Sequence, residues 1–227
     1  MKSFVFASVV LLGMSGSAWG TISTYGLDCI TNNNVSNCGI GEAQLAVDVV
    51  GGTTNSHLGI GIGSNQVLFV FRNAGPSNSS ITDIYFDDGT LLGIASVHNS
   101  AGVVFSQGAS PGNLPGGNLI TPAFVTTAGF SADSDAPVQP NGVNPGEYVG
   151  ILFNLISGQT YADTIAALNL GVSSPATQGS LRIGIHVQGF ANGGSESFVH
   201  TPEPGFYGLL SIGLAGLYFA ARRRRAA

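Results

Sequence analysis

The stretch LRIGIHVQGF, residues 181–190, alternates apolar and polar side chains along most of its length. Its apolar positions are Leu181, Ile183, Ile185 and Val187. The polar side chains between them are those of Arg182, His186 and Gln188. Because successive side chains of a strand point to opposite faces, this pattern predicts a strand with one buried face. Such strands are typical of antiparallel sheets.

Further segments of the chain have the composition of short strands and are separated by turns rich in glycine, proline and asparagine. These segments are residues 44–50, 66–72, 81–86, 90–97, 102–106 and 147–155. The turn Asp87-Asp88-Gly89 between two of them predicts a hairpin. The stretch 107–145 is dominated by glycine, proline, asparagine and serine, so it predicts loops with one short strand at 123–127.

One segment has helical signals. Thr160 and Asp163 form a capping box at the start of residues 160–168, and Ile165 and Leu168 supply an apolar side. Together the segments predict an all-β fold, an antiparallel β-sandwich or jelly roll with one short helix.

The composition limits the classes of function. The 227 residues fit one domain, of which 44% are hydrophobic and only 8% charged. The basic residues of the body are Arg72 and Arg182, while Lys2 and Arg222 to Arg225 lie in the terminal segments. Nucleic-acid binding requires cations that neutralise phosphates, so nucleic acid is excluded as a partner.

The N-terminal segment has the pattern of a secretory signal peptide. Lys2 precedes an apolar run at residues 4–12, and Ala18-Trp19-Gly20 offers a cleavage site before Thr21. A first buried strand or a retained anchor is the alternative, but the run is too short to span a bilayer. We therefore expect residues 1–20 to be removed on export.

The C-terminal segment has the pattern of a membrane stop. Residues 206–221 carry no charge and are followed by Arg222, Arg223, Arg224 and Arg225. Since positive charge stays on the cytoplasmic side, a transmembrane helix here places the body outside. One alternative is a buried C-terminal helix, but four consecutive arginines fit that poorly. The other is a basic tail that binds nucleic acid, and the apolar run before the arginines argues against it.

Pro202-Glu203-Pro204, the apolar run and the arginine cluster occur in this order at the chain end. This arrangement resembles the PEP-CTERM sorting signal of Gram-negative bacteria, although Thr201 stands where many members have valine. The resemblance implies that an exosortase, a membrane-embedded cysteine protease, recognises Pro202, Glu203 and Pro204. It further implies a protein that is anchored in the inner membrane before processing and then delivered to the cell surface or an exopolysaccharide biofilm matrix.

The resemblance divides the chain into a signal peptide (1–20), an extracytoplasmic domain (21–199) and a sorting signal (200–227). The segments 129–147 and 181–199 also resemble parts of other PEP-CTERM bodies, for which no biochemical activity is assigned. The expected partners are thus the exosortase and, transiently, the inner membrane. Exopolysaccharide is a further candidate.

Cys29 and Cys38 are the two cysteines of the chain. In an exported protein, two nearby cysteines predict a disulfide, here closing a polar, asparagine-rich surface loop. A metal pair or a redox dithiol is the alternative, but the spacing lacks the C-x-x-C pattern of such sites.

Acidic side chains raise the question of a metal. Asp87, Asp88, Asp133 and Asp135 are candidate calcium ligands, since calcium prefers clustered carboxylates and loop carbonyls. The alternative is that these aspartates hydrogen-bond the backbone of turns. No complete calcium-loop motif is present, so we expect no obligatory cofactor.

Gly108-Ala109-Ser110-Pro111-Gly112 matches the G-x-S-x-G motif of serine hydrolases. The residue after the serine must donate a backbone N–H to the oxyanion hole, and Pro111 has none. We therefore expect no catalytic residue and no enzyme, but a structural or adhesive surface protein. A carbohydrate- or calcium-binding module associated with exopolysaccharide is the alternative.

Overall fold

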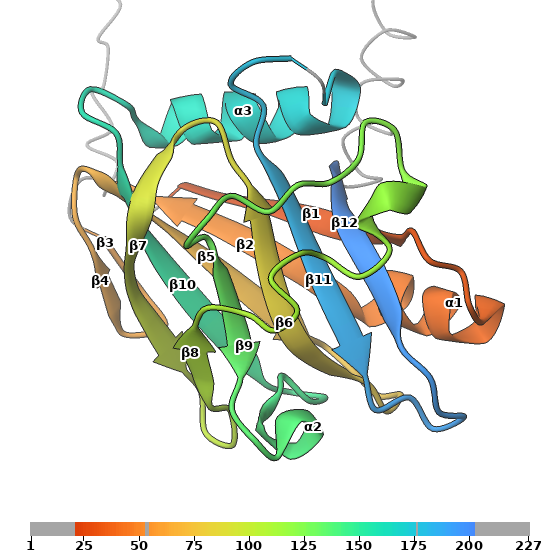
Figure 1. Ribbon diagram of the computed structural model, residues 1–227. Helices are drawn as coiled ribbons and strands as arrows, with labels where there is room; N and C mark the ends of the chain where they lie inside the picture. Colours follow the sequence, from red (N-terminus) through yellow and green to blue (C-terminus); the bar gives the residue numbers. More distant parts are fainter. Residues whose placement is uncertain (1–20, 53–54, 176, 203–227) are drawn as a thin grey trace, which may run out of the picture.

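The computed structural model describes residues 21–52, 55–175 and 177–202 (Figure 1). The predicted signal peptide, Glu203, Pro204, the apolar run and Arg222–Arg225 lie outside these residues. The strands are β1 (Thr21–Cys29), β2 (Leu45–Gly51), β3 (Asn55–His57), β4 (Ile60–Ile62), β5 (Gln66–Asn73), β6 (Ser80–Asp87), β7 (Leu91–Asn99), β8 (Phe105–Gln107), β9 (Ser131–Ser134), β10 (Tyr148–Leu155), β11 (Arg182–Gln188) and β12 (Glu196–Pro202). The helices are α1 (Val35–Gln44), the 3-10 turn η1 (Gly117–Leu119), α2 (Val138–Asn141) and α3 (Tyr161–Ser173).

A single antiparallel sheet dominates the fold. Its ten strands follow the order β7-β10-β5-β2-β1-β12-β11-β6-β9-β8, and β3 and β4 form a separate hairpin. The prediction of an antiparallel β-rich fold is confirmed. The predicted sandwich or jelly roll is replaced by one continuous sheet that curls into a nearly closed barrel (Figure 1).

The two edge strands of this sheet, β7 and β8, follow one another in the chain. The carboxamide of Asn99, the last residue of β7, bridges the gap between them. Its Nδ2 donates to the Phe105 carbonyl at 3.3 Å, and its Oδ1 accepts from the Phe105 N–H at 3.0 Å. Where the two edge strands meet, the Asn99 side chain therefore makes both of the hydrogen bonds that the backbone of a neighbouring strand would otherwise make to Phe105.

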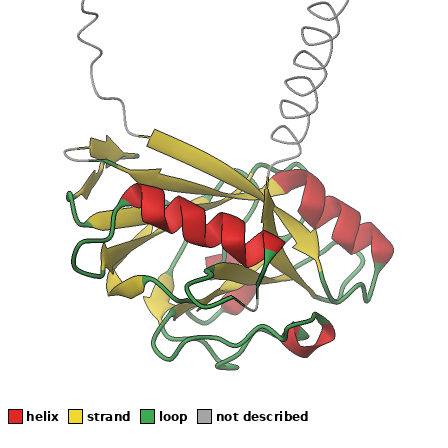
Figure 2. Ribbon diagram, turned by 90° about the horizontal axis from the view of Figure 1, so that it is seen from above, coloured by secondary structure: helices red, strands yellow, loops and turns green. Residues whose placement is uncertain are grey.

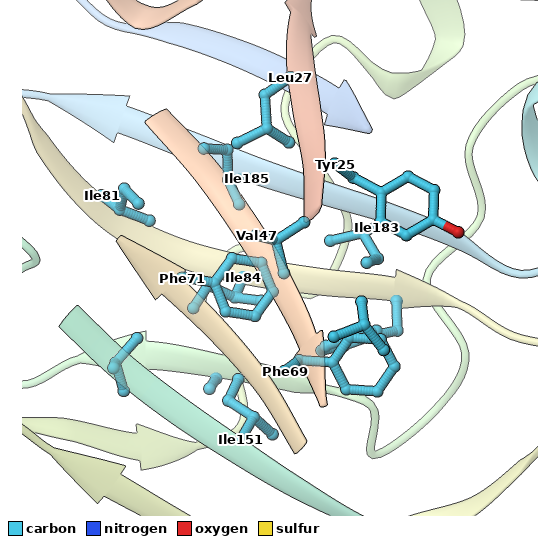
Figure 3. Close-up of a cluster of buried hydrophobic side chains, with 14 of the residues drawn as sticks. Tyr25, Leu27, Val47, Phe69, Phe71, Ile81, Ile84, Ile151, Ile183 and Ile185 are labelled. Atoms are coloured by element: carbon cyan, nitrogen blue, oxygen red, sulfur yellow. The ribbon is translucent and has the colours of Figure 1, made fainter. Parts of the chain in front are cut away.

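The barrel interior is filled by side chains from most of the strands (Figure 3). Phe69, Phe86 and Phe153 form an edge-to-face cluster with ring centroids 4.7–5.6 Å apart. Such aromatic pairs add about 0.5–1.5 kcal/mol each beyond the area they bury. The core therefore belongs to the concave face of one sheet.

Parts of the outer face are covered as well. The β3–β4 hairpin places Ile60 and Ile62 against Leu68 of β5, and the loop before β9 places Leu114 against Tyr85 of β6. This double coverage explains why residues 66–72 are apolar on both faces.

Helix α3 lies across one end of the sheet (Figures 1 and 2). Its predicted capping box is confirmed, because Thr160 Oγ1 accepts from the Asp163 N–H at 3.3 Å and Asp163 Oδ2 accepts from the Thr160 N–H at 2.8 Å. The helix extends to Ser173, beyond its predicted end at Leu168.

Three local expectations are wrong. Strands β6 and β7 are not a hairpin, since β6 pairs with β9 and β11 while β7 pairs with β10. Residues 123–127 form no strand, and the short strand of this region is β9. The segment after Asn34 forms helix α1 and not a loop, capped by Asn34 Oδ1, which accepts from the Ser36 N–H at 2.9 Å.

Candidate functional site

The described chain ends in β12, the strand that leads into the Pro-Glu-Pro tripeptide. This strand lies between β1 and β11, and its last residue, Pro202, is the register partner of Tyr25. The first and last strands of the body are therefore direct neighbours. Residues 200–202, at the start of the predicted sorting signal, belong to the sheet.

His200 anchors the end of β12 and is only 4% exposed. Its Nδ1 accepts from the Ile183 N–H at 3.0 Å, so Nε2 carries the proton and donates to the Leu168 carbonyl at 3.1 Å. Burial, aided by the charge of Arg182 and opposed by the two hydrogen bonds, lowers the pKa of His200 to about 4. The neutral imidazole thus ties the last strand to both β11 and α3.

The predicted disulfide between Cys29 and Cys38 is confirmed. It joins the end of β1 to helix α1. Beside it lies the fully buried carboxylate of Glu196, the first residue of β12. The carboxylate accepts from the Thr31 hydroxyl at 2.5 Å and from the N–H groups of Asn33 and Asn34 at 3.0 and 2.6 Å.

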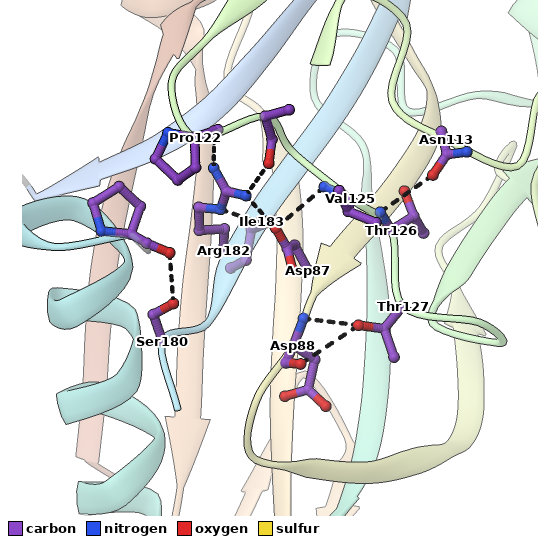
Figure 4. Close-up of polar contacts among 12 residues, drawn as sticks. Asp87, Asp88, Asn113, Pro122, Val125, Thr126, Thr127, Ser180, Arg182 and Ile183 are labelled. Atoms are coloured by element: carbon purple, nitrogen blue, oxygen red, sulfur yellow. Dashed lines mark hydrogen bonds and ion pairs between the residues drawn. The ribbon is translucent and has the colours of Figure 1, made fainter. Parts of the chain in front are cut away.

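Asp87 is engaged in an ion pair with Arg182 (Figure 4). Arg182 Nε donates to Asp87 Oδ2 at 3.0 Å, and its Nη2 contacts the same oxygen. The guanidinium also donates to the carbonyls of Pro122 and Ala123 at 2.8 and 2.6 Å. This pair fastens the loop before β9 to the sheet.

Asp88 follows β6, and its backbone N–H donates to Thr127 Oγ1 at 3.0 Å (Figure 4). Its Oδ1 accepts from the N–H groups of Thr90 and Leu91 at 2.5 and 2.7 Å. Burial raises the pKa of Asp88, although these hydrogen bonds oppose the rise. This is the backbone-bonding role that aspartate takes in turns.

Asp133 faces Asp83 across the β6–β9 pair. Asp83 is 3% exposed and accepts from the hydroxyls of Thr82 and Tyr85 at 2.7 and 3.3 Å. Asp133 accepts from the Ser110 N–H at 3.3 Å. Burial raises the pKa of both carboxyls, and for Asp133 burial and the charge of Asp83 raise it to about 6. The sequence does not predict the Asp83–Asp133 pair, because it gives no signal for strand β9.

Asp135 lies just beyond β9 and is exposed. Its Oδ2 accepts from the Ser106 hydroxyl at 3.2 Å. The four candidate calcium ligands therefore have separate partners and do not form one ligand set. Within the described ranges, a different set of residues brings three potential metal-ligand atoms together. These residues are Cys29, Cys38 and Glu196, whose ligand atoms all lie within 4.8 Å of one another.

A shallow pocket of about 300 Å³ opens beside α2. Its walls carry amides, hydroxyls and proline rings, and none of the lining side chains is charged. The lining residues are Asn78, Ser79, Ser80, Gln139, Pro140, Asn144, Pro145 and Gly189. Such walls can hydrogen-bond a neutral polar ligand.

Ser110 of the G-x-S-x-G match lies in an exposed loop over the Asp83–Asp133 pair. The carbonyl of Pro111 accepts from the Tyr85 hydroxyl at 2.9 Å, which fixes this loop on the sheet. In the part of the chain that the structure describes, no helix has the length and apolar character to cross a membrane.

A family model described as the PEP-CTERM protein-sorting motif matches residues 200–225. Searches of curated proteins and of solved structures gave no match. The matched residues begin at His200, the buried anchor of β12.

Proposed function

Starting from a chain that carries a PEP-CTERM protein-sorting motif at residues 200–225, we propose that an exosortase sorts this exported protein as a non-catalytic structural or adhesive component of the cell surface or matrix. The motif supports exosortase-dependent sorting and membrane processing of an exported protein. The observation that carries the proposal is the direct passage from the anchored strand β12 into the motif.

The way in which the chain leaves the sheet suits recognition by a protease. Among the described residues, the pairing of β12 with β1 reaches the partners Tyr25 and Pro202. Proline has no N–H to donate, so Pro202 and Pro204 disfavour further pairing of the chain with the sheet. His200, two residues before Pro202, holds the end of β12 on the folded body, directly before the rest of the motif.

The test is cell fractionation of the full chain with and without the exosortase. We expect the protein to lose mass and leave the inner membrane only when the enzyme is present. The triple variant Pro202→Ala, Glu203→Ala, Pro204→Ala should stay at full length in the membrane, whereas Ser157→Ala, in an exposed turn, should be processed normally.

Folding of each variant is checked separately by the presence of the Cys29–Cys38 disulfide and by resistance to protease. Normal processing of the triple variant, or of the wild type without the enzyme, would refute the sorting proposal.

The pocket beside α2 favours a second candidate, a module that binds a neutral glycan. Amides and hydroxyls without charged neighbours match the hydrogen-bonding groups of an uncharged sugar, and the rings of Pro140 and Pro145 offer apolar faces. A glycan array tests this, with Asn78→Ala as the pocket variant. Binding that is absent in the wild type, or unchanged in the variant, contradicts this candidate.

A further inference from the structure

The disulfide and Glu196 place three potential metal ligands together. The two sulfur atoms and a carboxylate oxygen of Glu196 all lie within 4.8 Å of one another. Cys29 Sγ is 3.7 Å from Glu196 Oε2, and because a disulfide sulfur carries no proton, this contact is not a hydrogen bond. The donor atoms come from β1, α1 and β12, and hydrogen bonds from Thr31, Asn33 and Asn34 to Glu196 connect β12 to the segment that leads into α1 in addition to the disulfide.

The carboxylate of Glu196 also lacks a cationic partner among the described residues. The two ion pairs there are Arg72–Asp48 and Arg182–Asp87. Glu196 is fully buried yet receives only neutral donors, the hydroxyl of Thr31 and two backbone N–H groups. Buried charges are usually paired or bound to a metal. This site therefore has an excess of negative charge that a cation would balance.

We propose that reduction of the Cys29–Cys38 disulfide opens a site for one Zn²⁺-class cation, bound by both thiolates and Glu196. In the oxidised protein the sulfur electron pairs are bonded to each other and the site is closed. In the reduced protein two thiolates and a carboxylate supply three of the four ligands of a tetrahedral zinc site. Asn32 Oδ1, 3.7 Å from Cys38 Sγ, or a water molecule fills the fourth position.

The chemical step balances with a phosphine or dithiol as the reductant. The reductant supplies two electrons and is oxidised, the S–S bond breaks, and two protons from solvent form the thiols. Zn²⁺ then displaces both protons into the buffer, so binding weakens as pH falls. The cation replaces the covalent cross-link between β1 and α1 with a coordinate one.

The experiment is a Co²⁺ titration of the full chain before and after reduction with tris(2-carboxyethyl)phosphine. We expect the reduced protein to bind one Co²⁺ with a thiolate-to-metal absorption band that one equivalent of Zn²⁺ abolishes. The oxidised protein should give no band. The double variant Cys29→Ser, Cys38→Ser should give none under either condition.

Glu196→Gln should weaken binding at least tenfold. The control is Asp135→Asn, which removes an exposed carboxylate beyond β9 and away from the site, and which should leave the affinity unchanged. If circular dichroism shows that Glu196→Gln does not fold, X-ray absorption of the zinc-loaded wild type replaces it, with two sulfur and two oxygen or nitrogen neighbours expected. No band in a folded, reduced wild type, or a coordination shell of oxygen and nitrogen alone, would overturn the proposal.

Discussion

At the residue scale, buried polar side chains hold the ends of the chain in place. His200 ties β12 to β11 and α3 through both ring nitrogens. Arg182 ties the loop before β9 to β11 through Asp87 and two carbonyls. Both residues are strongly buried although their side chains are polar. Their contributions depend on one charge state each, neutral for His200 and charged for Arg182.

The charge state of His200 gives a prediction for stability against pH. Its folded pKa of about 4 lies below the ordinary value of 6.5, so the unfolded chain binds the proton first. Stability is therefore lost as pH falls from 6.5 toward 4, by about 2–3 kcal/mol at full protonation of the unfolded state. Urea unfolding at pH 7.5 and 4.5 should show a more unfavourable stability change in the wild type than in His200→Gln, because the opposite contribution of Asp133 is common to both proteins. The control His57→Gln, on β3, should keep the wild-type dependence. An unchanged loss in His200→Gln contradicts the assignment.

The Asp83–Asp133 pair predicts the opposite sign. The folded pKa of Asp133, about 6, lies above the ordinary 3.8, so the folded protein holds the proton more tightly and stability falls as pH rises between these values. Asp133→Asn keeps the hydrogen-bonding shape without the charge. Its Tm should exceed that of the wild type by a few degrees at pH 7.5, with the difference vanishing near pH 4. Asp135→Asn, with an exposed carboxyl, is the control. A lower Tm for Asp133→Asn at pH 7.5 would show that the pair stabilises the fold.

At the element scale, helix α3 is placed by a close contact with β11. A Cβ at Gly171 would lie 2.0 Å from the backbone oxygen of Leu181, which cannot rotate away. The Leu181 N–H in turn donates to the Ala167 carbonyl at 3.0 Å. The helix therefore packs backbone to backbone on the strand that carries Arg182.

Gly171→Ala tests this contact. Alanine is the better helix former by about 1 kcal/mol, so propensity alone predicts a more stable protein. The clash predicts a net loss of roughly 2 kcal/mol or more in the free energy of unfolding. The comparison is Ala166→Gly on the exposed side of α3, where only propensity changes and about 1 kcal/mol is lost. A Gly171→Ala protein as stable as the wild type would mean that β11 yields easily.

Sequence patterns predict those elements whose signals are local. The capping box of Thr160 and Asp163 and the alternation of residues 181–190 give α3 and β11 correctly. The sequence does not predict helix α1 because VSNCGIGEAQ contains two glycines and has no clear apolar face, while the disulfide and the hydrogen bond from the Asn34 N–H to Glu196 fix the helix from outside. The sequence predicts the Asp87-Asp88-Gly89 turn correctly but not the pairing of the strands on either side of it. A turn does not determine which strands its flanking strands pair with.

At the scale of the whole molecule, closure of the sheet was beyond prediction. Alternating strands fit a sandwich and a barrel equally well, and the choice depends on which edges meet. Here β7 and β8 are linked by the Asn99 carboxamide on the Phe105 backbone, a side-chain interaction with no sequence signature. The Asp83–Asp133 pair depends in the same way on β9, which lies in a region typical of loops.

The central place of β12 predicts the effect of truncation. A chain that stops after Gly194 lacks β12, so β1 and β11 each lose a partner strand. We expect this chain to be cleaved rapidly by protease and to unfold without a cooperative transition. A chain that stops after Pro204 keeps His200 and should unfold cooperatively in urea. Cooperative unfolding of the shorter chain would show that β12 is dispensable.

The adjacency of β1 and β12 also sets an order of events in time. Strand β1 emerges first during export and must wait for β12, the last strand of the body, before both of its edges are paired. β12 also carries the first residues of the segment that the sorting-motif model matches, residues 200–225. The strand that completes the pairing of β1 is therefore the same strand in which the matched sorting motif begins.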